Sequence, residues 1–105
     1  MTRLFYNEIT DSVITFNDVK KLYDESVKAR FTQDSFPVWF ENVQSYNNGV
    51  LTEVYKFSMT VWLEDYERYE DIVAIGSNAK NACIKYGIDH NMFNYPVCIS
   101  SRKIN

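Results

Sequence analysis

The residues whose chemistry could support catalysis are few. His90 is the single histidine, so a nucleophilic pair could form only with Cys83 or Cys98. His90 lies in a stretch rich in Asn and Asp, where a solvated histidine is the expected state. These three residues also lack the close paired spacing that is typical of metal ligands. The three glycines are expected at the ends of elements, which leaves no phosphate-binding loop. We therefore expect no catalytic residue, no metal site, no cofactor and no enzyme activity.

A run of carboxylates between positions 64 and 71 is the most distinctive feature of the sequence. Arg68 is the only basic residue in this run. The acidic residues and the tyrosines between them are Glu64, Asp65, Tyr66, Glu67, Tyr69, Glu70 and Asp71. Burial of unpaired carboxylates is unfavourable, so the run predicts a solvated loop or hairpin end. Consecutive acids at such an end point outward, which disfavours glycosidase or metal-dependent nuclease chemistry, where carboxylates converge in one pocket.

Two interpretations of this run remain open. It is either a solvated turn that keeps a sheet edge from aggregating, or an anionic recognition surface. In the second case Tyr66 and Tyr69 are rigid contact residues, because tyrosine buries a large area for little loss of rotamer entropy. The predicted partner-binding residues are then all seven acids and tyrosines of the run. Such a surface could occupy a basic, nucleic-acid-binding surface of another protein.

The segments that flank the run predict strands. Residues 55–63 alternate with period two, and the odd-numbered residues face a core. Trp62 falls on the opposite face, where it is either covered by a helix or exposed for base stacking or partner contact. The apolar run from Ile72 to Ile75 shows no alternation and predicts a strand that is covered on both faces.

The first half of the chain predicts a hairpin followed by two helices. Residues 3–6 and 12–14 form the expected hairpin, around the polar turn from Asn7 to Asp11. Thr15 is the expected N-cap of a helix, with Asp18 closing a capping box. The apolar stripe of this helix extends from Val19 through Val27 towards Phe31. A second helix begins near Asp34 or Ser35, with Pro37 in its first turn, and ends at Gly49 in a left-handed cap.

The last part of the chain predicts a short helix and a final strand. Ser77 is the expected N-cap of the helix, Gly87 its stop, and Ile88 the apolar contact that accompanies the stop. The final strand covers residues 95–100, with Pro96 at its start or on a sheet edge. The order of these expected helices and strands predicts an α+β fold with a mostly antiparallel sheet, in a single domain 1–105. An N-terminal hairpin and helix pair extend to about residue 50, and a ββαβ portion with one short C-terminal helix covers about 51–105.

The composition and net charge of the chain restrict the classes of function. The net charge is −3 and the pI about 5.0, which argues against wrapping of nucleic-acid backbone. The amino terminus has no apolar leader and no segment could cross a bilayer, so a cytoplasmic location is expected. Buried free thiols are the expected state of the two cysteines, with a disulfide as the alternative. Seventeen aromatic residues leave room for an interface, in a homodimer or with another protein.

The segments RLFYNEITDSVITFNDVKKLYDE and SFPVWFENVQSYNNGVLTEV resemble short accessory proteins encoded by phages and mobile elements of Gram-positive bacteria. Anti-CRISPR and other anti-defence inhibitors of that class are similar in size and acidity. The resemblance implies an inhibitor, and the acidic run adds the expectation that it acts as a DNA mimic on a nucleic-acid-binding host or defence protein. The alternative from the residues is single-stranded nucleic-acid binding, with Trp62 stacking on bases and Lys56, Arg102 and Lys103 contacting phosphate.

Overall fold

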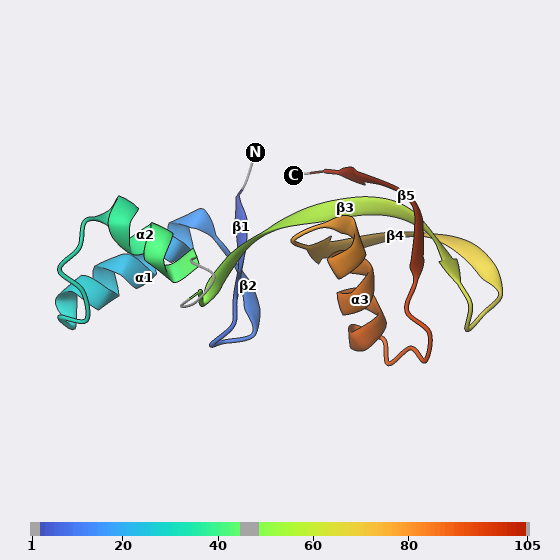
Figure 1. Ribbon diagram of the computed structural model, residues 1–105, viewed down its shortest axis with the longest axis horizontal. Helices are drawn as coiled ribbons and strands as arrows, with labels where there is room; N and C mark the ends of the chain where they lie inside the picture. Colours follow the sequence, from blue (N-terminus) through green and yellow to red (C-terminus); the bar gives the residue numbers. More distant parts are fainter. Residues whose placement is uncertain (1–2, 45–48, 105) are drawn as a thin grey trace. The chain divides into compact units, whose positions relative to one another are not determined.

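A computed structural model describes residues 3–44 and 49–104 of the chain. These residues form three helices and five strands, which confirms the α+β prediction (Figure 1). In order they are β1 (Leu4–Asn7), β2 (Ser12–Thr15), α1 (Phe16–Lys28), α2 (Phe36–Gln44), β3 (Leu51–Leu63), β4 (Arg68–Gly76), α3 (Ala79–Asp89) and β5 (Val97–Lys103). The chain divides into two compact units, residues 2–53 and 54–105, which we call the amino-terminal and carboxy-terminal units.

The five strands form one antiparallel sheet. Four of them follow the order β2-β1-β3-β4, and the fifth, β5, pairs with β3. Residues 51–53 of the long strand β3 belong to the amino-terminal unit, and the rest of β3 belongs to the carboxy-terminal unit. In the carboxy-terminal unit β3 is therefore the central strand, with β4 and β5 on its two sides.

The amino-terminal unit follows the sequence prediction closely at its start. The hairpin of β1 and β2 forms as expected, and Asp11 takes a positive φ of 51° in its turn. The capping box at the start of α1 is also confirmed. The backbone N–H of Asp18 donates to the Thr15 hydroxyl oxygen, and that of Thr15 donates to the Asp18 carboxylate. The core of the unit consists of Phe5, Val19 and Leu51.

The end of the first helix differs from the prediction. The apolar stripe was expected to continue to Phe31, but Val27 is 42% exposed and Phe31 is 86% exposed. The reason is local: α1 ends at Lys28, and Arg30 takes a left-handed backbone conformation with φ of 61°. The chain therefore turns away before Phe31 could reach the helical stripe. Pro37 lies in the first turn of α2 as predicted. The predicted helix end with its cap at Gly49 depends on residues 45–48, which lie outside the described residues.

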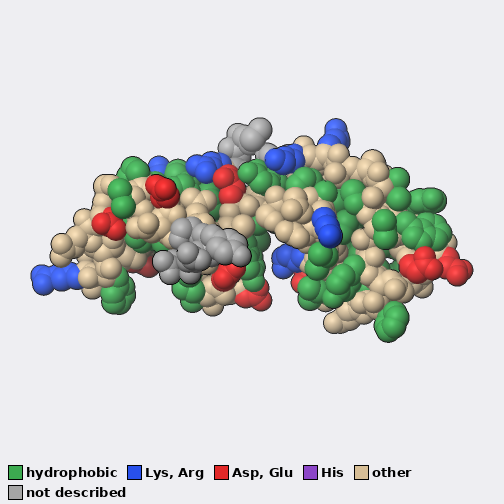
Figure 2. Space-filling view, viewed as in Figure 1, with side chains coloured by type: hydrophobic (Ala, Val, Ile, Leu, Met, Phe, Trp, Pro, Cys, Tyr) green, Lys and Arg blue, Asp and Glu red, His purple; other side chains and the backbone are tan. Residues whose placement is uncertain are grey.

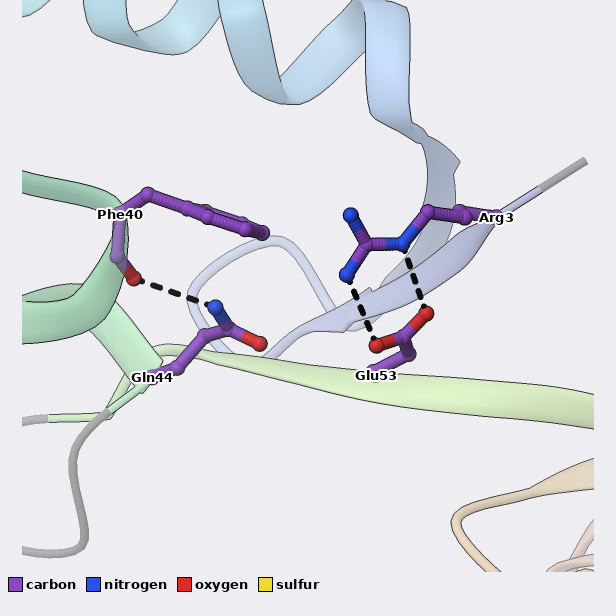
Figure 3. A network of polar contacts seen from close by, with 4 residues as sticks. All are labelled: Arg3, Phe40, Gln44 and Glu53. Atoms are coloured by element: carbon purple, nitrogen blue, oxygen red, sulfur yellow. Dashed lines mark hydrogen bonds and ion pairs between the residues drawn. The ribbon is translucent and has the colours of Figure 1, made fainter. Parts of the chain in front are cut away.

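Arg3 links the start of β3 to the rings of the amino-terminal unit. Its guanidinium donates two hydrogen bonds to the carboxylate of Glu53, at 2.9 and 3.0 Å (Figure 3). The same guanidinium lies 5.0 to 5.6 Å from the ring centroids of Phe5, Phe16 and Phe40. A bidentate pair that is also stacked on aromatic rings favours Arg over Lys at this position.

In the carboxy-terminal unit the core lies between one face of the sheet and α3 (Figure 1). The predicted alternation of β3 is confirmed, since Phe57, Met59, Val61 and Leu63 are buried. The prediction that residues 72–75 are covered on both faces is wrong, because Val73 is 56% exposed. In residues 54–104 α3 is the single helix, and it can cover only one face of β4.

The predicted boundaries of α3 are also corrected. Asn78, and not Ser77, is the N-cap, because its side-chain oxygen accepts from the backbone N–H of Asn81. Gly87 does not end the helix but lies inside it, and a Cβ at this position would be 2.4 Å from the Tyr95 ring. The glycine is thus used for a close approach and not for a turn. Ile88, the expected contact of a helix stop, is 56% exposed.

The final strand is shifted towards the carboxyl end of the chain. β5 begins at Val97 and extends to Lys103, whereas residues 95–100 were predicted. Pro96 precedes its first residue as expected. A bulge lies opposite the step from Thr60 to Val61, where β5 passes from Ser100 to Cys98. No helix in the described residues is long and apolar enough to cross a membrane.

Candidate partner-binding surface

The acidic run forms a tight turn and the first part of a strand. Within the turn the backbone N–H of Tyr66 donates to the Leu63 carbonyl, and that of Glu67 donates to the Glu64 carbonyl. Glu67 takes a left-handed conformation with φ of 52°. β4 already begins at Arg68, so the expectation that the run is a loop or hairpin end holds for residues 64–67, and residues 69–71 are part of the sheet. Figure 2 shows acidic side chains beside hydrophobic ones at the place where this turn lies in Figure 1.

The two tyrosines of the run point to opposite sides of the hairpin. Tyr69 is paired with Trp62, and the two rings make an edge contact with a centroid distance of 4.8 Å. Tyr66 lies beside Arg68, whose guanidinium is 5.1 Å from the ring centroid. Both tyrosines are exposed, at 59% for Tyr66 and 65% for Tyr69. The β3–β4 turn and the start of β4 thus offer two separate contact sites, and the two rings do not form a single aromatic patch.

Several carboxylates of the run are ordered by neighbouring donors. Glu64 accepts from the Trp62 indole N–H at 2.7 Å, and Asp71 accepts from the Thr60 hydroxyl at 2.7 Å. Glu70 pairs with Arg68 at 3.3 Å. Glu67 lies at the tip of the turn and is exposed. Glu64, Glu70 and Asp71 therefore each have a hydrogen-bond or ion-pair partner while they remain in contact with solvent.

Asp65 has a structural role that the sequence did not indicate. Its carboxylate accepts hydrogen bonds from the backbone N–H groups of Phe93 and Asn94, at 2.9 and 3.0 Å, and from the Asn94 side-chain amide at 3.0 Å. These three bonds connect the β3–β4 turn to the loop between α3 and β5. The Phe93 side chain is 93% exposed, so its backbone is fixed while its ring stands in solvent.

A small hollow of about 180 Å³ opens on the helix side of this projection. Two of the residues that line it, Tyr86 and His90, stack at a centroid distance of 3.9 Å. The other residues that line it are Leu63, Tyr66, Arg68, Glu70 and Met92. Its walls thus combine aromatic and apolar side chains with one carboxylate and one guanidinium that pair with each other.

On the other side, the three strands of the carboxy-terminal unit present a face that α3 does not cover; we call it the open face. Val97, Trp62 and Tyr69 are paired across β5, β3 and β4 and form an apolar row on it. Next to this row is a hollow of about 330 Å³ that is mostly polar. It is lined by Ser58, Met59, Thr60, Asp71, Ser100, Ser101 and Arg102. Trp62 is half-buried against Tyr69 and Glu64, and not beneath α3.

The residues of the nucleic-acid-binding alternative are only partly brought together. Lys56, Trp62 and Arg102 lie on the open face, since Lys56 and Trp62 are an even number of residues apart and Arg102 is paired with Ser58. Lys103 is paired with Phe57 and lies on the other face. Its amine is 3.9 Å from the centroid of the Tyr55 ring.

The candidate catalytic residues do not converge. His90 caps α3, and its Nδ1 lies 2.9 Å from the Tyr86 carbonyl oxygen. Cys83 is buried in the core, where its thiol donates to the Met59 sulfur at 3.8 Å. Both cysteines are free thiols, as the sequence predicted, but only Cys83 is buried, and Cys98 is half-buried. Among the described residues there is no group of three or more potential metal ligands.

The sequence reading missed Phe93 and Val97. Phe93 belongs to the stretch rich in Asn and Asp around His90, and Val97 to the predicted final strand. The available signal was a large aromatic residue between asparagines, outside any apolar periodicity, where no element could bury it.

No family model, curated protein or solved structure matches the chain.

Proposed function

We propose that this chain is a non-enzymatic protein-binding inhibitor or regulator. Two segments would make the contact: the β3–β4 turn, and the loop between α3 and β5 that carries Phe93. In this proposal they form one projection, which occupies a basic, nucleic-acid-binding surface of a partner protein. Together with the resemblance to phage and mobile-element accessory proteins, this suggests an anti-defence role of the anti-CRISPR type. The observation that carries the proposal is a group of exposed aromatic side chains, Tyr66, Tyr69 and Phe93, with carboxylates around them. Asp65 fixes the backbone at Phe93 by accepting hydrogen bonds from its N–H and from that of Asn94.

The physical argument rests on preorganisation. An exposed aromatic ring on a fixed backbone loses little conformational entropy on binding, and such rings often dominate the binding energy of an interface. Phe93, Tyr66 and Tyr69 meet this description. The carboxylates around them supply charge complementarity with lysine and arginine side chains, which increases the association rate and excludes acidic partners. Phosphate groups bind the same basic surfaces, so the projection would compete with nucleic acid.

The test begins with capture of partners from an extract of a Gram-positive bacterium. The binding constant for each captured protein is then measured with the wild-type chain and with Phe93→Ala. Truncation of a dominant contact costs at least about 2 kcal/mol, which corresponds to roughly a 30-fold loss of affinity. The captured protein should also bind labelled DNA, and the wild-type chain should displace that DNA. Retention of full affinity by both Phe93→Ala and Tyr66→Ala would contradict the proposed surface.

Charge reversal provides a matched pair of variants. Glu64→Lys with Glu67→Lys changes the charge at the turn, whereas Asp24→Lys with Glu25→Lys makes the same change on the exposed side of α1. We expect the first pair to weaken partner binding and the second pair to leave it unchanged. If both pairs weaken binding equally, the effect comes from net charge and not from this surface.

A second candidate function is supported by the open face. The hydroxyl groups of Ser58, Thr60 and Ser100 and the guanidinium of Arg102 line a hollow beside Trp62. Such groups could contact the phosphates of a single strand while Trp62 stacks on a base. A titration with a labelled oligonucleotide at low salt tests this, since the binding should weaken steeply as salt is added. Here Glu64→Lys with Glu67→Lys should strengthen binding, the opposite of its effect on a basic protein partner.

A further inference from the structure

The two cysteines come from different elements but meet over the same part of β3. Cys83 is on α3, and its thiol contacts the side chain of Met59. Cys98 is on β5 and is paired with Val61, two residues further along β3 on the same face. Both side chains pack in the core cluster of the carboxy-terminal unit. The two sulfur atoms are therefore neighbours in space, although fifteen positions separate them in the sequence.

The two thiols differ in access. Cys83 is 3% exposed, whereas Cys98 is only partly buried. Burial raises the pKa of the Cys83 thiol, and the neighbouring Cys98 raises it further. A reagent from solution therefore reaches Cys98 first, and Cys83 is placed to react with whatever forms there.

We propose that Cys83 and Cys98 form a reversible dithiol–disulfide pair that reacts with low-molecular-weight disulfides. In the first step the Cys98 thiolate attacks one sulfur of the external disulfide, and one thiolate leaves. In the second step Cys83 loses its proton to solvent and attacks the Cys98 sulfur, which releases the second thiolate. The protein loses two electrons and two protons, and the external disulfide is reduced to two thiols. The product links α3 to β5 and closes the loop that contains Phe93.

The test is exposure of the reduced, folded protein to excess glutathione disulfide. We expect wild-type protein to lose both free thiols without retaining glutathione, as measured by thiol titration after unfolding and by intact mass. A link across a loop of this length should raise the melting temperature by about 10 °C, and reduction should reverse the rise.

Single-cysteine variants identify the order of the steps. Cys83→Ala should retain one glutathione at Cys98, because no second thiol displaces it. Cys98→Ala should leave Cys83 unmodified while the protein is folded. Should either variant fail to fold, the wild-type result alone still decides. A stable glutathione adduct on wild-type protein, two unreacted thiols, or a disulfide between two chains would each overturn the proposal.

Discussion

The two units of this molecule differ in how many of their aromatic side chains are exposed, although Phe31 is exposed in the first unit and Phe57 is buried in the second. In the amino-terminal unit the rings of Phe16, Phe36 and Phe40 contact one another with centroid distances of 5.3 to 5.9 Å, and Phe5 is completely buried beside them. In the carboxy-terminal unit the rings of Tyr66, Tyr69 and Phe93 are exposed. The aromatic excess of the sequence therefore has two origins: one part makes a core, and the other part is available to a partner.

The charged groups follow the same division. In the amino-terminal unit the Arg3 guanidinium lies against aromatic rings and is paired with Glu53 at the surface, so its charge is used within the unit. In the carboxy-terminal unit the carboxylates of the turn face solvent, and Asp65 orders a loop. The comparison suggests that substitutions in the first unit should change stability, and that substitutions at the hairpin end should change binding. The four predictions below test this division.

The largest effect is expected for Phe5→Ala. Removal of a fully buried phenylalanine costs about 3 to 5 kcal/mol, through lost transfer energy and the cavity that remains. Urea unfolding followed by circular dichroism measures this cost. Phe31→Ala is the matched control, since this ring is 86% exposed and its loss should change stability by less than about 0.5 kcal/mol. Similar losses for both variants would contradict the assignment of the aromatic core.

The second largest loss of stability is expected at Gly76, where β4 and α3 are in close contact. A Cβ at Gly76 would be 2.4 Å from the backbone nitrogen of Ala82, so Gly76→Ala must displace the helix. We expect a loss of about 1 to 3 kcal/mol, the usual range for overpacking. Gly87→Ala is the comparison variant, for which we expect a smaller loss, because the added Cβ would displace the Tyr95 side chain and not the backbone, and alanine favours the helix. If Gly87→Ala is the more harmful of the two, the side chain of Tyr95 is held more firmly than its exposure suggests.

Local patterns in the sequence predicted the elements that depend on neighbouring residues. The alternation along β3 and the capping box at Thr15 each involve residues within one element, and both are confirmed. The run from Ile72 to Ile75 was misleading because an apolar sequence does not state how many layers cover a strand. Gly87 was misleading for a related reason, since the Tyr95 ring that requires a glycine there comes from a different segment.

The candidate site was predicted in composition and not in arrangement. The acidic and aromatic residues of the run were identified, but the separation of Tyr66 from Tyr69 depends on the length of the turn. Once that turn pairs Leu63 with Arg68, the alternation of side chains along β4 places Tyr69 beside Trp62. The contact of Asp65 with Phe93 joins residues 28 positions apart, which no local pattern indicates.

A smaller effect is expected for Asp65→Asn. The amide nitrogen cannot accept a hydrogen bond, so one of the backbone N–H groups that the carboxylate now binds loses its partner. The expected loss is about 1 kcal/mol of stability, with faster amide hydrogen exchange at Phe93 and Asn94 and weaker partner binding. Glu67→Gln removes the same charge at the tip of the turn and is the control. Unchanged exchange at both amides would show that Asp65 does not fix the loop.

The smallest effect is a pH dependence in the amino-terminal unit. Hydrogen bonds from the backbone N–H and the side chain of Thr15 lower the pKa of Asp18 from its ordinary value of 3.8. Because the folded state binds this proton more weakly than the unfolded state, the stabilisation is present above pH 3.8 and is lost as the pH falls through the lower, folded value. Thermal unfolding between pH 6 and pH 2 should therefore show a smaller decline in Asp18→Asn than in the wild type. Asp24→Asn makes the same change elsewhere on α1 and is the control. A decline in Asp18→Asn as steep as that of the wild type would mean that the capping carboxylate does not contribute to the acid sensitivity of this unit.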